Sequence, residues 1–220
     1  MKKLLSDHNE IIRNLQRNLE EINRFSEGQP RRRAEETTAA VEAASNKSQG
    51  IALQLKVIAA RQQEAARDVH NEYRKNHGSN KRPATPSEML FYQNQASLLR
   101  DMTPEGRIPG YHYLIGKLTP PERENWRYLF DDYLELLAQG DELAQLQIQA
   151  AIDQYRSPDE KAALRAMIQA DRMAEYVPTI EGILKSNLLE ASKGEAIAND
   201  PESVFDGILN DIEAETKAAG

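Results

Sequence analysis

The fold is decided by residues 31–76, which read RRRAEETTAAVEAASNKSQGIALQLKVIAARQQEAARDVHNEYRKN. Apolar and small residues recur in this stretch at alternating steps of three and four, which is the spacing of a coiled-coil seam. Twelve positions keep the rhythm between Ala34 and Tyr73. A single helix over these residues would be roughly 70 Å long, at about 1.5 Å per residue. We therefore expect a long helical rod whose seam is covered by other helices.

One segment inside the rod carries a competing signal. After Gly50, the apolar residues Ile51, Leu53, Leu55 and Val57 alternate with other residues, a pattern typical of a strand. The flanking segments are rich in alanine and contain no proline. These flanks favour a helix that continues through Gly50.

A second seam lies upstream, where Leu5, His8, Ile12, Leu15, Leu19 and Ile22 keep the same spacing. The segment at residues 27–30 then interrupts it, with Gly28 suited to a helix end and Pro30 to a new helix start. Residues 1–76 therefore predict two helices with a break near 27–30. The pattern leaves open whether they form a hairpin within one chain or pack between chains.

The expected helix-packing or oligomer interface follows from these seams. Because Ala and Ser bury little apolar area, the downstream seam alone would hold a two-stranded coil weakly, and a multi-helix bundle is favoured. We expect this interface to contain Ile12, Leu15, Leu19, Ile22, Val41, Ala52, Leu55, Ala59 and Val69.

The second half of the chain is punctuated by helix starts. Residues 77–84, with Gly78 and Pro83, predict a linker. Three capping boxes with proline at the first turn follow, at Thr85–Glu88, Thr119–Glu122 and Ser157–Glu160, and Asp200–Glu202 is a partial version. Nine of the thirteen aromatic residues lie between Phe91 and Tyr155, so a core is expected there. The repeats share caps without sharing core residues, which favours an irregular multi-helix bundle over residues 85–220 rather than an α-solenoid. The predicted fold class is all-α.

The charge is unevenly distributed along the chain. The net charge of −7 combines +5 over residues 1–83 with −12 over residues 84–220. Opposite halves of neighbouring copies could attract each other, the basic half could meet an acidic partner, or the two halves could simply be solvated surfaces of different charge. The candidate phosphate contacts are Arg31, Arg32, Arg33, Lys75, Lys81 and Arg82. Nearby glutamates and the lack of aromatic residues for base stacking disfavour nucleic acid as the main partner.

Chemistry-bearing groups are sparse. The segment Gly110–Thr119 has the wrong glycine spacing for a phosphate loop and instead predicts a turn or helix that buries Tyr111 and Ile115. His112 is interpreted as a hydrogen-bonded structural residue. Arg127, Asp131 and Glu135 follow one another at steps of one helical turn. The two carboxylates beside the arginine are interpreted as ordinary surface charges rather than as catalytic groups. No catalytic, metal-binding or cofactor-binding residue is predicted.

The sequence therefore predicts a non-enzymatic helical protein that self-associates or docks into a larger particle, such as a virion internal, scaffolding, ring or tube component. The alternative is a cytosolic coiled-coil adaptor or regulator that binds a protein partner, and a lesser one is sequence-independent nucleic-acid contact through the basic half. The chain has no cysteine and no apolar run of about 20 residues, so a cytoplasmic location, with packaging into a virion or other particle as an option, and no membrane span are expected.

Overall fold

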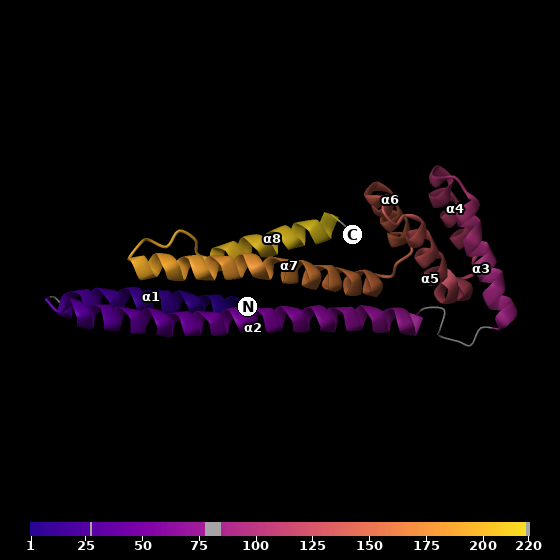
Figure 1. Ribbon diagram of the computed structural model, residues 1–220. Coiled ribbons are helices and arrows are strands. Elements are labelled where there is room, and N and C mark those ends of the chain that lie inside the picture. Colours follow the sequence, from indigo (N-terminus) through magenta and orange to yellow (C-terminus); the bar gives the residue numbers. More distant parts are fainter. Residues whose placement is uncertain (27, 78–84, 219–220) are drawn as a thin grey trace. The chain divides into compact units, whose positions relative to one another are not determined.

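The computed structural model describes residues 1–26, 28–77 and 85–218. Within these residues the chain is all-α, with eight helices and no strand (Figure 1). The helices are α1 (Lys2–Phe25), α2 (Pro30–His77), α3 (Pro86–Asp101), α4 (Pro104–Lys117), α5 (Pro120–Leu137), α6 (Glu142–Asp153), α7 (Pro158–Lys193) and α8 (Pro201–Ala218). The predicted fold class is confirmed.

The long helix and its start are as expected. Gly28 has φ of +81°, the left-handed conformation in which glycine avoids the strain that a side chain would bring. Helix α2 begins at Pro30 and continues through Gly50 to His77, so the strand-like alternation after Gly50 is overridden. The predicted linker at 78–84 lies outside the described residues, and the domain division placed there stays a prediction.

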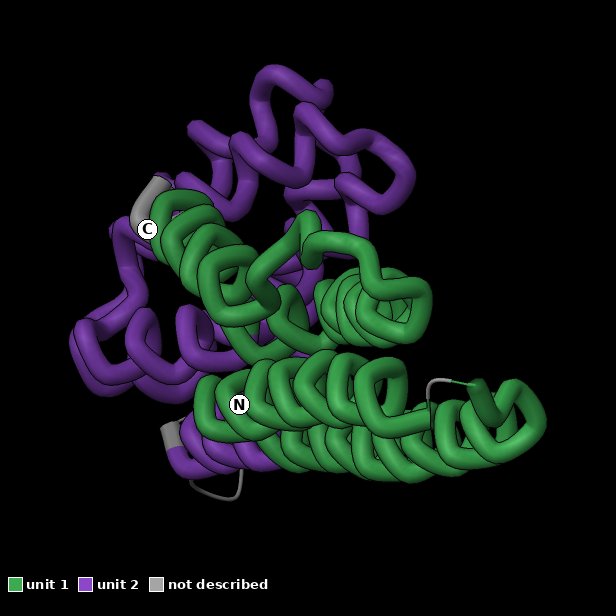
Figure 2. Tube along the Cα trace, turned by 90° about the vertical axis from the view of Figure 1, so that its left-hand side faces the viewer, with its two compact units in different colours: residues 1–64, 168–217 green, residues 65–167, 218–220 purple. Residues whose placement is uncertain are grey.

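The described chain forms two compact units (Figure 2). Unit 1 comprises Met1–Glu64 and Ile168–Lys217, whereas unit 2 is built from Ala65–Met167. In sequence, unit 2 is therefore an insertion between the two halves of unit 1. Helices α2 and α7 each contribute residues to both units.

Unit 1 begins with an antiparallel hairpin of α1 and the first part of α2. Ser26 donates to Glu36 beside the turn, at 3.1 Å, and the His8 ring contacts the Ser48 hydroxyl further along, at 3.2 Å. Sequence numbers thus rise along α1 as they fall along α2. The hairpin is formed within one chain.

The second half of unit 1 completes a four-helix bundle. Polar contacts join α2 to α7, α7 to α8 and α8 to α1, each pair running antiparallel. Helices α2 and α7 are joined by Lys56–Glu181 and Gln63–Asp171. Helix α7 contacts α8 through Gln169–Thr216 and the segment just before α8 through Asn187–Asn199. Helix α1 contacts α8 through Lys2–Asp206 and the residue before it through Asn9–Asp200. Figure 1 shows α1 along α2 and α8 along α7.

The interior of the bundle is almost entirely aliphatic. All four helices contribute buried side chains, among them Leu5, Ile12, Leu15, Ile51, Leu55, Ile180, Leu184, Phe205 and Ile208. Among the few buried polar residues, His8 is completely buried and its Nε2 has no hydrogen-bond partner among the described residues. Burial lowers the pKa of His8 to about 4.

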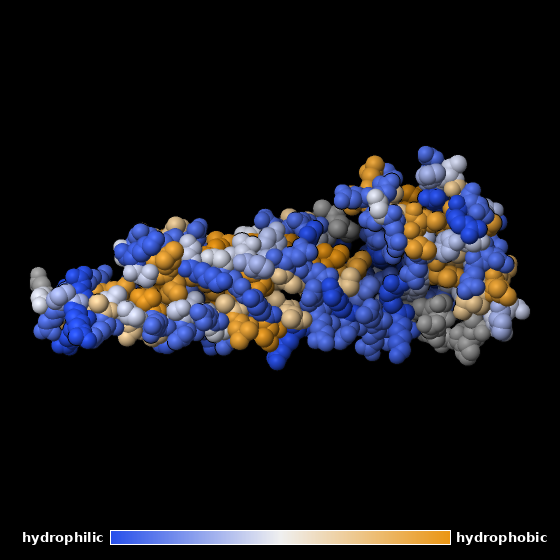
Figure 3. Space-filling model, in the orientation of Figure 1, coloured by the Kyte–Doolittle hydropathy of each residue, from blue (hydrophilic) through white to orange (hydrophobic). Residues whose placement is uncertain are grey.

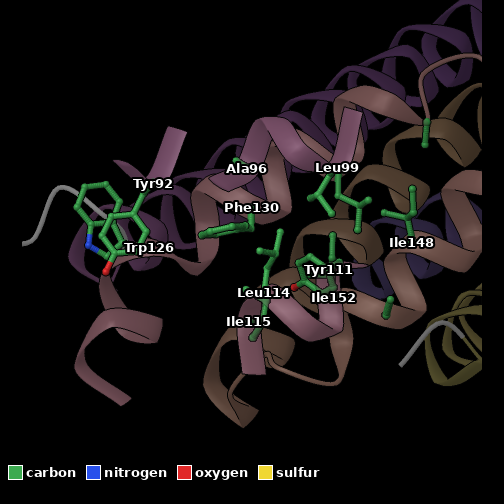
Figure 4. Packing of buried hydrophobic residues seen from close by; sticks show 13 residues of the cluster. Tyr92, Ala96, Leu99, Tyr111, Leu114, Ile115, Trp126, Phe130, Ile148 and Ile152 are labelled. Atoms are coloured by element: carbon green, nitrogen blue, oxygen red, sulfur yellow. The ribbon is translucent and has the colours of Figure 1, made fainter. Parts of the chain in front are cut away.

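Unit 2 has a different interior, built from aromatic residues (Figure 4). Trp126 and Phe130 of α5 belong to it, together with Tyr111 of α4 and Leu99 of α3. The Tyr92 ring stacks on the Trp126 ring with centroids 4.4 Å apart. The expected core between Phe91 and Tyr155 is confirmed.

The predicted caps start the helices at the expected residues. The Thr85 and Ser157 hydroxyls accept from the backbone N–H groups of Glu88 and Glu160, each at 3.2 Å. The Glu122 carboxylate accepts from the Thr119 N–H at 2.8 Å. Asp200 accepts from the Ser203 N–H at 3.1 Å. Each contact satisfies a donor that the first turn of a helix leaves unpaired.

Candidate functional site

Most of the expected interface residues are used inside unit 1. Ile12, Leu15, Leu19, Leu55 and Ala59 are buried, Ile22, Val41 and Ala52 are half-buried, and Val69, which belongs to unit 2, is exposed. A fully buried side chain has no surface left to contact another chain. The largest seam residues therefore serve helix packing within the molecule, and any interface between molecules uses other faces.

The buried stripe of α2 is displaced from the expected seam. Ala44 and Ile51 are buried, whereas Thr38 and Gln62, which the seam includes, are exposed. Two helices, α1 and α7, contact α2, so its stripe is broader than a coiled-coil seam and is centred closer to Ile51. Heptad spacing alone does not distinguish these two lines on the helix.

The candidate phosphate contacts do not gather at one place that the structure describes. Arg31 and Arg32 bind the carboxylates one turn later, with Arg31 Nε 3.1 Å from Glu35 and Arg32 Nε 2.8 Å from Glu36. Arg33 and Lys75 are exposed at opposite ends of α2, and Lys81 and Arg82 lie outside the described residues. Two of the six cations are thus already engaged.

A buried ion cluster in unit 2 is the feature that the sequence did not predict. The Arg127 guanidinium lies 3.3 Å from Asp131 Oδ2 and 2.5 Å from Glu160 Oε2, and it donates to the Tyr155 carbonyl at 2.5 Å. Arg156 adds a second cation, 3.6 Å from Glu160. The side chains of Arg127, Asp131 and Glu160 are almost completely buried.

The tyrosine and carboxylate groups of this cluster are strongly perturbed. Tyr111 donates its hydroxyl to Asp131 Oδ1 at 2.6 Å. Burial raises the pKa of Asp131 to about 7, against the opposing influence of Arg127 and the Tyr111 hydroxyl. Burial and the Asp131 charge also raise the pKa of Tyr111, so that the phenol remains a donor.

The interpretation of Arg127 and Asp131 as surface residues is wrong. Their spacing of four is the spacing of an exposed helix pair, and nothing local distinguishes the two cases. The missing information is the contact with Glu160, which lies 33 residues further along the chain. Glu160 completes a capping box in sequence, yet in the structure its carboxylate is bound by Arg127 and Arg156.

A pocket of about 350 Å³ adjoins the cluster, lined partly by the side chains of Tyr73, Tyr128 and Tyr155. Arg127 and Glu160 form part of its wall, but each already has several partners within the cluster. The arrangement holds the start of α7 against α5. Its geometry supports a structural role for these charges.

The glycine-containing segment and His112 are as expected. Residues 110–117 belong to α4, with Tyr111 and Ile115 in the core. His112 Nδ1 lies 2.9 Å from the Tyr155 hydroxyl. Within the described residues, no group of three or more acidic or histidine side chains is arranged to hold a metal ion.

Unit 2 exposes two apolar helix faces. On α3, Leu90, Phe91 and Leu98 are 59%, 55% and 44% exposed, although Tyr92, Ala96 and Leu99 on the opposite side are buried. On α6, Leu143 and Leu146 are 66% and 69% exposed, opposite the buried Ile148 and Ile152. Both helices are thus apolar on the inner and the outer side, a pattern typical of helices covered on both faces.

Comparison with protein-family models, with curated proteins and with solved structures finds no match to this chain. Among the helices that the structure describes, none is long and apolar enough to cross a membrane.

Proposed function

We propose that this protein is a non-enzymatic helical assembly protein, which works by associating with copies of itself or with other proteins in a larger particle. The observation that carries the proposal is the pair of exposed apolar faces on α3 and α6 in unit 2. Because the long seam is consumed within unit 1, these faces replace it as the expected contacts.

The exposed residues on these two faces have large apolar side chains. More than half or nearly half of the surface of each side chain is exposed to water. They are Leu90, Phe91 and Leu98 on α3 and Leu143 and Leu146 on α6. Removing such surface from water stabilises an association by about 25 cal/mol per Å². Single exposed leucines are common in proteins, but clusters on one helix face mark interaction sites.

The buried polar groups support a structural role. Arg127, Asp131 and Tyr111 bind one another inside unit 2, and His112 binds Tyr155. Reactive groups poised for catalysis would instead face a substrate. Nucleic-acid contact is weakened as an alternative, because Arg31 and Arg32 are held by Glu35 and Glu36.

A virion internal, scaffolding, ring or tube component is the setting that we propose. A cytosolic adaptor that binds one protein partner is distinguished by its mass, since an adaptor would be a monomer or dimer and a scaffold a larger species. Light scattering on the purified chain measures this directly.

The decisive experiment combines this mass measurement with 1 M salt and with the double variant Leu143→Glu with Leu146→Glu. An apolar contact persists in 1 M salt, whereas an association of opposite charges weakens because salt screens it. The variant should lower the mass, since each glutamate would be buried without a partner. The control, Gln145→Glu, adds a charge on α6 at an exposed polar position that is turned away from the face of Leu143 and Leu146, and should keep the native mass.

A chain that remains monomeric at high concentration and binds no protein contradicts the proposal. So does an assembly whose mass is unchanged both by the α6 variant and by Leu90→Glu with Leu98→Glu on α3. In each case circular dichroism checks that the variant keeps the native helix content.

A further inference from the structure

The core of unit 1 contains a layer of polar side chains, which we call the polar layer. It consists of His8 of α1, Ser48 of α2 and Asn187 of α7, and these residues are 0%, 5% and 0% exposed. Figure 3 shows that hydrophilic side chains cover much of unit 1 on the face that is drawn, as is usual for the outer sides of helices. The polar layer lies inside, where polar groups are stable only when they are hydrogen-bonded.

The polar layer separates the two aliphatic clusters of unit 1. On each of the three helices, its member lies between one residue of the first cluster and one of the second, three or four positions away. The first cluster contributes Leu5, Ile51 and Leu184. The second cluster contributes Ile12, Ala44 and Ala191. This arrangement places His8, Ser48 and Asn187 at one level of the bundle.

Two hydrogen bonds connect the polar layer to neighbouring segments. The His8 Nδ1 atom lies 3.2 Å from the Ser48 hydroxyl, which joins α1 to α2. The Asn187 amide nitrogen donates to the Asn199 carbonyl at 2.9 Å, which joins α7 to the segment just before α8. Because a carbonyl can only accept, the Asn187 nitrogen must face Asn199, and the Asn187 oxygen is left for another donor.

Two atoms of the polar layer have no hydrogen-bond partner among the described residues. They are His8 Nε2 and Asn187 Oδ1, and both atoms are buried. The two atoms are chemically complementary, since an imidazole N–H donates and an amide oxygen only accepts. An unpaired donor and an unpaired acceptor thus lie at the same level of one core.

We infer that His8 Nε2–H is hydrogen-bonded to Asn187 Oδ1, directly or through one internal water, and that this link sets the register of the α1–α2 hairpin on α7. A neutral imidazole carries one N–H, so His8 Nδ1 then accepts from the Ser48 hydroxyl. One internal water can bridge two buried polar groups of this kind. The hydrogen bonds form a continuous path from α2 through α1 and α7 to Asn199. This inference concerns the packing of one chain and goes beyond the proposed function, which it does not require.

The aliphatic layers alone specify the register weakly. They present Leu, Ile and Ala on both sides of the polar layer, so a shift of α7 by one turn would again pair aliphatic residues. The same shift would separate His8 from Asn187 and place each of them beside aliphatic side chains. A buried donor or acceptor without a partner is strongly unfavourable, so the polar layer disfavours the shifted arrangements. A single buried asparagine sets the register of coiled coils in the same way.

The first test introduces a carboxylate beside His8. Asn187→Asp should raise the pKa of His8 from about 4 to above its ordinary value of 6.5, because an adjacent negative charge stabilises the imidazolium. Titration of the His8 ring signals by nuclear magnetic resonance measures this pKa. The control is Leu189→Asp, which adds the same charge on the exposed side of α7 and should leave the pKa of His8 below 6.5. A pKa of His8 that stays below 6.5 in Asn187→Asp would overturn the link.

The second test measures the register itself in the double variant His8→Leu with Asn187→Leu. The chain has no cysteine, so Asn46→Cys and Lys185→Cys place one spin label on α2 and one on α7, both at exposed positions. The native layer should give one narrow distance between the labels. The double variant should give a broader distribution or a second distance, shifted by up to about 5 Å, which is the rise of one helical turn. Its melting temperature should not fall, because replacing both polar partners by apolar groups of similar shape is nearly neutral or stabilising.

The control for the second test is Leu184→Met. It changes the neighbouring aliphatic layer with little change in volume and should keep the single distance. An unshifted single distance in the double variant would overturn the role of the polar layer in setting the register.

The native chain provides a test that does not depend on the folding of any variant. The nitrogen resonances of the His8 ring show which nitrogen carries the proton. A protonated Nε2 and an unprotonated Nδ1 are expected at neutral pH, and a proton on Nδ1 would overturn the inference. Light scattering, which tests the proposed function, is independent of these results, so the two proposals can fail separately.

Discussion

Unit 1 and unit 2 are built from helices alone within the described residues, yet they bury different kinds of side chain. Unit 1 packs mainly aliphatic residues in long regular stripes, with a few buried polar side chains such as His8 and Asn187. Unit 2 packs short helices around a core with several aromatic residues and encloses the Arg127 cluster. Regular stripes can be found by spacing alone, whereas a buried ion cluster depends on contacts between distant parts of the chain. The comparison predicts that the two units respond differently to mutation and to acid.

The largest effect is expected from Arg127→Met. The change leaves Asp131 and Glu160 buried without their cation and should lower the free energy of unfolding of unit 2 by about 3–5 kcal/mol. Urea titration followed by fluorescence measures this, because Trp126 is the single tryptophan and lies in unit 2. The control is Arg74→Met, since Arg74 pairs with the exposed Asp132 and should contribute at most about 1 kcal/mol. Equal losses in the two variants would mean that the cluster does not hold unit 2 together.

Lowering the pH should destabilise unit 1 through His8 and stabilise unit 2 through Asp131. The pKa of His8 is about 4 in the folded chain, below the ordinary histidine value of 6.5, so the unfolded chain takes up a proton first as the pH falls. The free energy of unfolding of unit 1 should therefore fall by up to about 3 kcal/mol as the pH falls from 6.5 to 4. Above pH 6.5 this stability is fully present. The pKa of Asp131 is raised in the folded chain, so the folded chain holds this proton more tightly than the unfolded chain does. The contribution of Asp131 to the stability of unit 2 therefore increases as the pH falls from about 7.

Hydrogen exchange of α1 amides and Trp126 fluorescence follow the two units separately across this range. His8→Met should flatten the acid response of unit 1, and Asp131→Asn should flatten that of unit 2. Unchanged profiles in these variants would assign the pH dependence to other groups.

A smaller effect is expected at the helix caps. Thr119→Ala should cost about 1 kcal/mol, since the start of α5 loses its capping threonine. Asp200→Ala in unit 1 should cost more, because Asp200 caps α8 and also accepts from the Asn9 amide of α1 at 2.8 Å. Thermal unfolding of both variants shows which one loses more stability. A larger loss in Thr119→Ala than in Asp200→Ala would contradict the role of Asn9.

The smallest effects are expected at two glycines, with opposite signs. Gly50→Ala should stabilise the monomeric chain by up to about 1 kcal/mol, since the new methyl group meets nothing. Gly110→Ala should destabilise unit 2, because its methyl group would overlap Met102 Sδ. The flexible Met102 side chain can move away, which keeps the cost near about 1 kcal/mol. Melting temperatures measured in dilute solution distinguish the two signs.

The fold class, the break at Gly28 and the capped starts at Thr85, Thr119 and Ser157 could be predicted because each depends on neighbouring residues. The return of α7 and α8 onto the α1–α2 hairpin could not, since no local signal pairs Gln63 with Asp171. The exposure of Leu143 and Leu146 on α6 could not be predicted either, because spacing does not tell an inner from an outer face.

Unit 2 is inserted between the unit 1 parts of α2 and α7, and this has a consequence for synthesis on the ribosome. The hairpin of α1 and α2 emerges with its apolar side open, and the helices that cover it are translated only after another 103 residues. At about 5–20 residues per second this delay lasts roughly 5–20 s. During that time the nascent hairpin offers Leu15 and Leu55 to any passing helix, including one from a neighbouring ribosome on the same messenger. Exchange of α7 and α8 between two newly made chains is the misassembly to which this topology is most exposed.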